Sequence, residues 1–186
     1  MPNWCYNQFT VVHEDQQMIE RFVKAVEENK LLNEFIPMPK ELEDTTSPSR
    51  DTNEQLIEKY GYNNWYNWRI DNWGTKWDIS SGAVVELIGN EAFGSFSTAW
   101  SPPIPFFEAL TDLGFDVNIT YDEEGMGFMG IYNSVEGEIY QEYPNFEDPD
   151  WRKGIINPDI LALLDQRYDT WLEEQEELEQ LERING

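Results

Sequence analysis

The chain has 186 residues, with 37 acidic side chains, 12 basic side chains and a formal net charge of −25 at pH 7. This length predicts one domain, or one domain with an appendage. The charge argues against direct binding of nucleic-acid phosphates, because that binding needs clustered cations. It indicates instead a partner with a basic surface, such as a protein that normally holds nucleic acid.

Cys5 is the only cysteine, so no intrachain disulfide can form, and we expect a cytoplasmic protein. The first residues show no basic region followed by an apolar run, and no stretch reaches the apolar length of a membrane helix. Neither a signal peptide nor contact with a membrane is therefore predicted. Aromatic residues make up 15 % of the chain, which is enough to build a compact core.

Residues 4–12 carry aromatic and β-branched side chains and predict a first strand. Asp15 is the expected N-cap of the helix that follows, because apolar residues then recur at helical spacing to about Asn29. The prolines at positions 37 and 39 cannot continue that helix.

Residues 40–55 are polar and charged and are predicted to form a mobile insertion. A short helix is expected from Asn53 to Tyr60, with Gly61 ending it. Residues 62–73 are rich in Asn, Trp and Tyr and fit no element cleanly.

Two further strands are predicted at 82–88 and 92–100, on either side of a Gly-Asn turn. An apolar stripe over 106–113 predicts a helix, and alternation over 115–121 predicts a strand. The order strand, helix, strand, strand, helix, strand is typical of the split βαβ, ferredoxin-like pattern.

Two extra strands are expected at 127–132 and 135–140. The predicted fold is therefore α+β, a ferredoxin-like antiparallel sheet with extra C-terminal strands and an insertion after the first helix. Its domain would span 1–142, with the insertion at about 40–76.

Residues 143–186 are predicted to form an acidic connector and a long acidic C-terminal helix. Asn157 followed by Pro158 is a strong helix start. One face of this helix, running to about Ile184, is expected to be apolar. Its members are Leu161, Leu164, Tyr168, Trp171 and Leu178.

The chain resembles a family of uncharacterised phage and plasmid proteins that carry a YubB-type ferredoxin-like domain. The resemblance covers roughly the first 140 residues and implies a ferredoxin-like fold and a mobile-element origin. It transfers no catalytic residues. The segments that carry it are Met1-Pro2-Asn3-Trp4-Cys5, Asn7, Pro37-Met38-Pro39, Trp73-Gly74-Thr75-Lys76-Trp77-Asp78, Thr98-Ala99-Trp100-Ser101-Pro102-Pro103 and Gly127-Phe128-Met129-Gly130.

An aromatic cluster with one cation is the first candidate site. Its members are Trp73, Lys76, Trp77 and Trp100, and Trp100 is expected on one face of the predicted strand 92–100. The tryptophans could stack a nucleotide-type ring while the lysine meets a phosphate. The alternative is that the tryptophans fill the core and that Lys76 pairs with Asp71 or Asp78, which is the more usual role of such clusters.

Metal and catalytic motifs are lacking in this sequence. Asp122, Glu123 and Glu124 do not have the spacing of a calcium loop and are expected to form a solvated turn. With His13 as the only histidine, no His-based metal site is predicted, and no cofactor is expected. The sequence has no phosphate-cradling glycine loop and no nucleophile elbow, so a non-enzymatic protein is predicted.

The end of the C-terminal helix is crowded with carboxylates: Glu173, Glu174, Glu176, Glu177, Glu179 and Glu182. Acidic side chains there oppose the helix dipole, at about 0.3–1 kcal/mol each. Such a repeated local cost suggests an acidic surface that imitates DNA or docks on a basic groove. A solubilising tail and a homodimer through this helix remain alternatives.

These observations lead to two functional hypotheses. The first is a phage or plasmid protein that inhibits or sequesters a host nucleic-acid-handling or defence protein through its acidic surface. The second is a small-ligand binder that uses the tryptophan and lysine cluster.

Overall fold

The computed structural model describes residues 3–48 and 53–185, with side chains described as far as Arg183. A six-stranded antiparallel sheet lies at its centre, with the spatial order β2-β3-β1-β4-β5-β6. The strands are β1 (Trp4–Val12), β2 (Val84–Ile88), β3 (Glu91–Ala99), β4 (Asp116–Glu123), β5 (Phe128–Asn133) and β6 (Gly137–Glu142).

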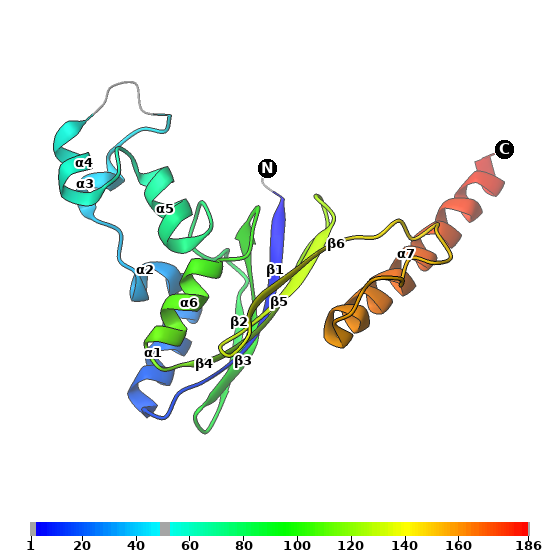
Figure 1. Cartoon of the computed structure of the whole chain (residues 1–186), viewed down its shortest axis with the longest axis horizontal. Helices are drawn as coiled ribbons and strands as arrows, with labels where there is room; N and C mark the ends of the chain where they lie inside the picture. The colour runs from blue at the N-terminus through cyan, green and yellow to red at the C-terminus, as the bar shows by residue number, and fades with distance from the viewer. Residues whose placement is uncertain (1–2, 49–52, 186) are drawn as a thin grey trace.

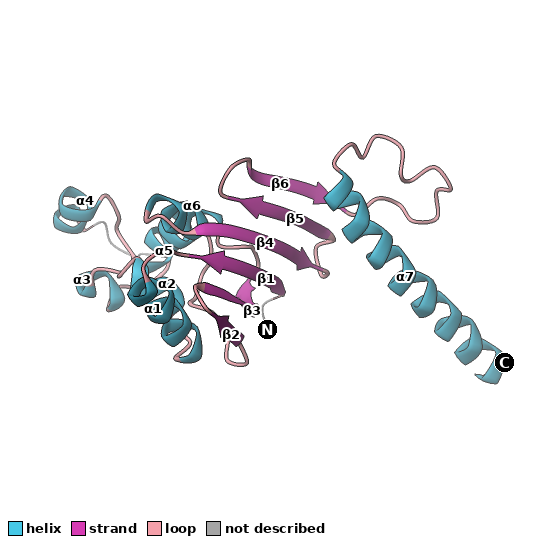
Figure 2. Ribbon diagram, turned by 90° about the horizontal axis from the view of Figure 1, so that it is seen from below, coloured by secondary structure: helices cyan, strands magenta, loops and turns pink. Residues whose placement is uncertain are grey.

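Helices lie on both sides of this sheet. They are α1 (Gln16–Glu27), α2 (Leu31–Phe35), α3 (Lys40–Glu43), α4 (Glu54–Tyr60), α5 (Trp65–Trp73), α6 (Ile104–Asp112) and α7 (Pro158–Asn185). Figures 1 and 2 show α1 to α6 on one side of the sheet and α7 on the other. The predicted α+β, ferredoxin-like fold is confirmed, because β1, α1, β2, β3, α6 and β4 follow its order and β5 and β6 extend the sheet beyond β4.

The main core lies between the sheet and helices α1 and α6. Strand β1 alternates strictly, so Phe9 and Val11 point into this core while their neighbours point to the opposite face. Phe22 of α1 and Leu110 of α6 close over them, and all four side chains are buried. Burial of each such side chain contributes about 1.5–3 kcal/mol, so this layer accounts for much of the stability.

A buried amide fixes the pairing of β1 with β3. The side chain of Asn7 is fully buried, and its Nδ2 donates to the carbonyl of Cys5 and to Oγ1 of Thr98, at 3.0 Å each. Because an unpaired amide in this position would cost about 1–3 kcal/mol, a register that separated Asn7 from Thr98 is disfavoured.

The boundaries of the first helix differ slightly from expectation. Asp15 is its N-cap, as predicted, with the carboxylate accepting from the backbone N–H of Gln17 at 2.9 Å. The helix ends at Glu27 rather than at Asn29, because Asn29 adopts a left-handed φ of 56°. The separate helix α2 then precedes the predicted proline break.

The prediction of a mobile insertion over 40–55 is wrong where the chain is described, and residues 49–52 lie outside the described part. Helix α3 buries Leu42 against the main core, and Glu41 pairs with Lys59 of α4 at 2.8 Å. The helix from Glu54 to Tyr60 is confirmed, with Gly61 in a left-handed conformation after it. Residues 62–73, which fitted no element in the sequence, contain helix α5. Asn64 is its N-cap, and the side-chain oxygen of Asn64 accepts a hydrogen bond from the backbone N–H of Asn67.

A second core joins the connector and α7 to the far face of the sheet. Met129 and Ile131 of β5 contact a group of buried side chains: Phe146, Trp151, Ile160 and Leu164. Asn157 caps α7 as predicted, its Oδ1 accepting from the backbone of Asp159 and Ile160. Nowhere in the described chain is there a helix long and apolar enough to span a membrane.

Candidate functional site

The four residues of the predicted aromatic cage do not share one environment. Trp73 is buried at 2 % exposure, where it packs edge to face on Trp68 and its indole N–H donates to the carbonyl of Ile36 at 2.9 Å. Trp100 lies beyond the end of β3, with a left-handed φ of 75° and an exposed side chain, so its predicted place on the strand face is wrong. The burial of Trp73 argues against a role in stacking a ligand.

The half-buried Lys76 lies beside the exposed rings of Trp77 and Trp4. The Lys76 ammonium lies 4.6 Å from the centre of the Trp77 ring, and the rings of Trp77 and Trp4 are 6.4 Å apart. Asp78, a predicted partner of Lys76, instead accepts three backbone hydrogen bonds, two of them at the start of α2. Burial raises the pKa of the Asp78 carboxyl, although these N–H groups oppose the rise.

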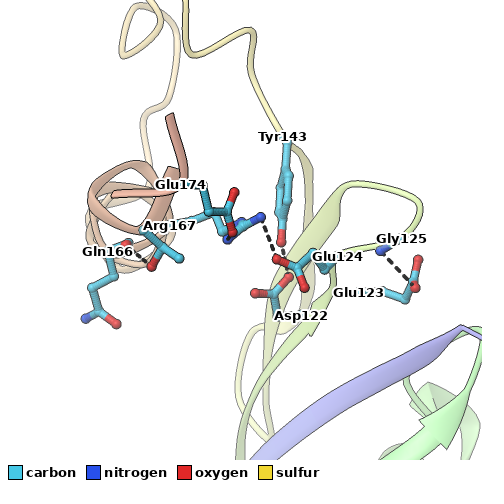
Figure 3. Close-up of polar contacts among 9 residues, drawn as sticks. Asp122, Glu123, Glu124, Gly125, Tyr143, Gln166, Arg167 and Glu174 are labelled. Atoms are coloured by element: carbon cyan, nitrogen blue, oxygen red, sulfur yellow. Dashed lines mark hydrogen bonds and ion pairs between the residues drawn. The ribbon is translucent and has the colours of Figure 1, made fainter. Parts of the chain in front are cut away.

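A polar junction ties α7 to the end of β4 (Figure 3). The Arg167 side chain is only 15 % exposed and pairs with Glu124 at 2.5 Å and with Glu174 at 3.3 Å. Its guanidinium also lies 5.6 Å from the centre of the Tyr143 ring. The Tyr143 hydroxyl donates a hydrogen bond to Asp122. One guanidinium therefore joins the helix, the connector and the strand end.

The turn predicted at 122–124 is not simply solvated. Asp122 and Glu123 are the last residues of β4, and Glu123 is buried with its carboxylate accepting from the backbone of Gly125 and Met126. Burial raises the pKa of Asp122, against the opposing effects of Tyr143 and Arg167. Only Glu124 is exposed as expected.

No group of three or more His, Cys, Asp or Glu side chains within the described residues is arranged to hold a metal ion. Cys5 lies on the buried side of β1, and burial raises the pKa of its thiol, so it is held in the protonated, poorly nucleophilic form.

The predicted carboxylate cluster occupies the far part of α7. We refer to residues 172–183 as the acidic tail, and every side chain in it is exposed. Figures 1 and 2 show this part of α7 pointing away from the sheet. Leu178, expected on a buried face, is 54 % exposed because the second core ends near Trp171. Arg183 is the single cation of the tail and pairs with Glu179 at 3.1 Å.

The charge of the sheet region has the same sign as the tail. The segment from Trp77 to Trp151, which contains strands β2 to β6, has fifteen Asp and Glu residues and no Lys, Arg or His. Strand β1 also has no Lys, Arg or His. None of the six strands therefore carries a cationic side chain. The strands therefore offer no cationic side chain to a phosphate-bearing ligand.

A comparison with known protein families gives a match that covers strands β2 to β6. Residues 72–153 match the family model for the ferredoxin-like domain in Api92-like protein. The match begins near the end of α5 and includes the connector as far as Lys153, so it differs from the expected range of the first 140 residues.

One solved structure is similar to this chain, the crystal structure of a protein Api92 from Yersinia pseudotuberculosis. The TM-score is 0.42 at 9 % sequence identity, over 77 % of this chain and 98 % of that chain. No curated protein matches the sequence.

The sequence did not point to the junction at Arg167. Its members lie in three elements, and neither Tyr143 nor Arg167 belongs to a recognisable motif. A single signal was present: Arg167 is the only cation of α7 before the acidic tail.

Proposed function

We propose that this chain is a non-enzymatic binding protein of a phage or plasmid that holds a host protein through an acidic surface. The partner would be a nucleic-acid-handling or defence protein whose basic surface normally faces nucleic acid. The observation that carries the proposal is the acidic tail, a helical segment with six exposed glutamates and one arginine.

The spacing of charge in the tail supports imitation of a nucleic-acid backbone. From Glu173 to Glu182 an α-helix rises about 13.5 Å, so the six carboxylates are spaced on average about 2.7 Å apart along the axis. Duplex DNA carries one charge per about 1.7 Å of its axis. A basic groove shaped for DNA would therefore meet about two-thirds of the linear density of negative charge that DNA presents.

The anchoring of α7 supports a presented surface rather than a loose end. Ile160 and Leu164 are buried in the second core, and Arg167 is tied to Glu124. A helix held at its first half presents the second half in a defined direction, which lowers the ordering cost of binding. A second copy of this chain is a less favourable partner, because two tails side by side would repel each other.

The test is capture from a host lysate with competition by duplex DNA. The full chain is compared with a variant in which Glu173, Glu174, Glu176, Glu177, Glu179 and Glu182 are all changed to Gln. We expect the full chain to retain a basic protein that duplex DNA displaces, and the variant to bind it at least about 10-fold more weakly, since charge pairing across an interface is worth several kcal/mol in total.

A matched control distinguishes the effect of the tail carboxylates from the effect of a reduced net charge. It neutralises six exposed carboxylates elsewhere, at Glu14, Glu20, Glu27, Glu58, Glu108 and Asp112. This control should keep its affinity for the captured protein within about 3-fold, because long-range charge is screened beyond about 8–10 Å at physiological salt. Equal loss in both variants, or a partner that DNA does not displace, would contradict the proposal.

A further inference from the structure

The face of the sheet opposite α1 and α6 is only partly covered. Helix α7 begins over β5, and beside it a depression of about 570 Å³ extends over β2, β3, β1 and β4. A second depression of about 270 Å³ shares Tyr6, Gln8 and Thr120 with the first and reaches Leu163 and Arg167 of α7. We refer to the two together as the sheet groove.

Strand register determines the floor of the sheet groove. Ser95, Gln8 and Thr120 are paired across β3, β1 and β4, and residues paired across strands point to the same face. The adjoining row is Phe93, Thr10 and Asn118. The floor therefore consists of two rows of uncharged side chains.

The uncharged floor is unusual in a chain with a net charge of −25. Carboxylates lie at its margins, where Glu91 and Asp159 line the larger depression and Asp122 lines the smaller one. Asp116 lies on the same face and accepts a hydrogen bond from Nδ2 of Asn118 at 3.4 Å. Among the described residues that line the groove, Arg167 is the only cation, and it is already paired with two glutamates. Phosphate-bearing ligands are thus disfavoured, and a ligand with positive charge at its ends is favoured.

The hydrogen-bonding groups of the floor suit a peptide backbone. Gln8 and Asn118 are exposed, and each side-chain amide has both a donor and an acceptor, as a peptide group has. Tyr6, 49 % exposed, and Phe93 provide aromatic surface beside them. The amide groups can bond to the main chain of an extended peptide, and the aromatic rings can contact its side chains.

We propose that the sheet groove binds an extended peptide segment bearing lysine or arginine, supplied by a protein partner. Gln8 and Asn118 bond to its peptide groups, and Glu91 and Asp159 receive its cationic side chains. The site stands apart from the function proposed above, because none of these residues lies in the acidic tail.

The test uses a fluorescein-labelled octapeptide that alternates lysine with valine. Thr120→Arg places a cation and extra volume in the middle of the floor, and Glu91→Gln removes one marginal carboxylate. We expect Thr120→Arg to weaken binding at least about 10-fold and Glu91→Gln about 3-fold, and the tail variant with six Glu→Gln changes to stay within about 3-fold.

Nuclear magnetic resonance keeps the test independent of folding defects in a variant. In the unaltered chain, the peptide should shift the amide signals of Gln8, Thr10, Asn118 and Thr120. The proposal is overturned if the same peptide with glutamate in place of lysine binds equally well. It is also overturned if a thymidine octanucleotide binds this face more tightly, or if about 1 mM lysine peptide leaves these signals unmoved.

Failure here is distinguishable from failure of the acidic tail. Loss of peptide binding in the tail variant, with Thr120→Arg unchanged, would place the peptide on the tail and contradict the groove. If the tail variant still binds the peptide but no longer captures the host protein, the proposal for the groove stands. The two ligands would then bind at two separate surfaces.

Discussion

The guanidinium of Arg167 lies 2.5 Å from the carboxylate of Glu124, and this pair joins the middle of α7 to the turn after β4. Glu124 is exposed, whereas the arginine side chain is largely buried beside Tyr143. The orientation of the acidic tail therefore depends on a contact made far from it in sequence. The predictions below begin with this pair.

Replacement of Arg167 by Met should loosen α7 without unfolding the sheet. The aliphatic part of the side chain is kept, but Glu124 and Glu174 lose their shared cation. Because Glu124 is solvated, we expect a loss of only about 1–2 kcal/mol in the free energy of unfolding. Hydrogen exchange should quicken over residues 158–171. Arg183→Met, which removes an exposed pair in the tail, is the control and should leave exchange in that segment unaltered.

The stability of the junction should depend on pH through Asp122. Burial raises the pKa of this carboxyl in the folded state, so it favours folding when protonated, and that contribution is lost as the pH rises through the folded-state pKa. Asp122→Asn does not titrate. The melting temperature of the Asp122→Asn variant minus that of the unaltered chain should therefore increase from about pH 4 to about pH 7. A constant difference across this range, in thermal melts followed by circular dichroism, would show that Asp122 is not responsible.

Gly94 should be required for the edge strand β2. A Cβ added at this position would lie 1.9 Å from the backbone oxygen of Val84, which cannot move without displacing its strand. We expect Gly94→Ala to lower the free energy of unfolding by about 2–3 kcal/mol in urea titrations. Ser97→Ala in the same strand should change it by less than about 0.5 kcal/mol. Similar small effects for both would mean that β2 adapts to the added methyl group.

Trp73 and Lys76 should behave differently although they are three residues apart. Trp73→Phe leaves a void and an unpaired carbonyl at Ile36, so a loss of about 1–3 kcal/mol is expected. Lys76→Ala removes a cation–π contact between this half-buried lysine and the exposed ring of Trp77 and should cost less than about 1 kcal/mol. Urea titrations measure both. If Trp73→Phe had no effect on stability but changed nucleotide-induced quenching of fluorescence, the ligand role predicted for this tryptophan would be restored.

Local patterns determined the fold of this protein. The alternation in β1, the Asp15 cap and the glycine after Tyr60 each involve neighbours in sequence, and their structures agree with expectation. The ferredoxin-like order of elements followed from such signals, because hydrophobic periodicity identifies a strand or a helix without knowledge of its partners. The exposed glutamates of the tail belong with them, since a glutamate side chain is rarely buried unless it is paired.

Tertiary packing alone decided which polar and aromatic side chains are accessible. Trp73 and Trp77 have similar sequence surroundings, yet one packs under Trp68 and the other remains at the surface. Asp122 and Glu123 belong to an acidic run that predicts solvent exposure. Tyr143 and α7 partly cover Asp122, however, and Glu123 is buried against the backbone of the turn after β4. The physical reason is that burial depends on which distant element covers a given face, and a local pattern does not contain that information.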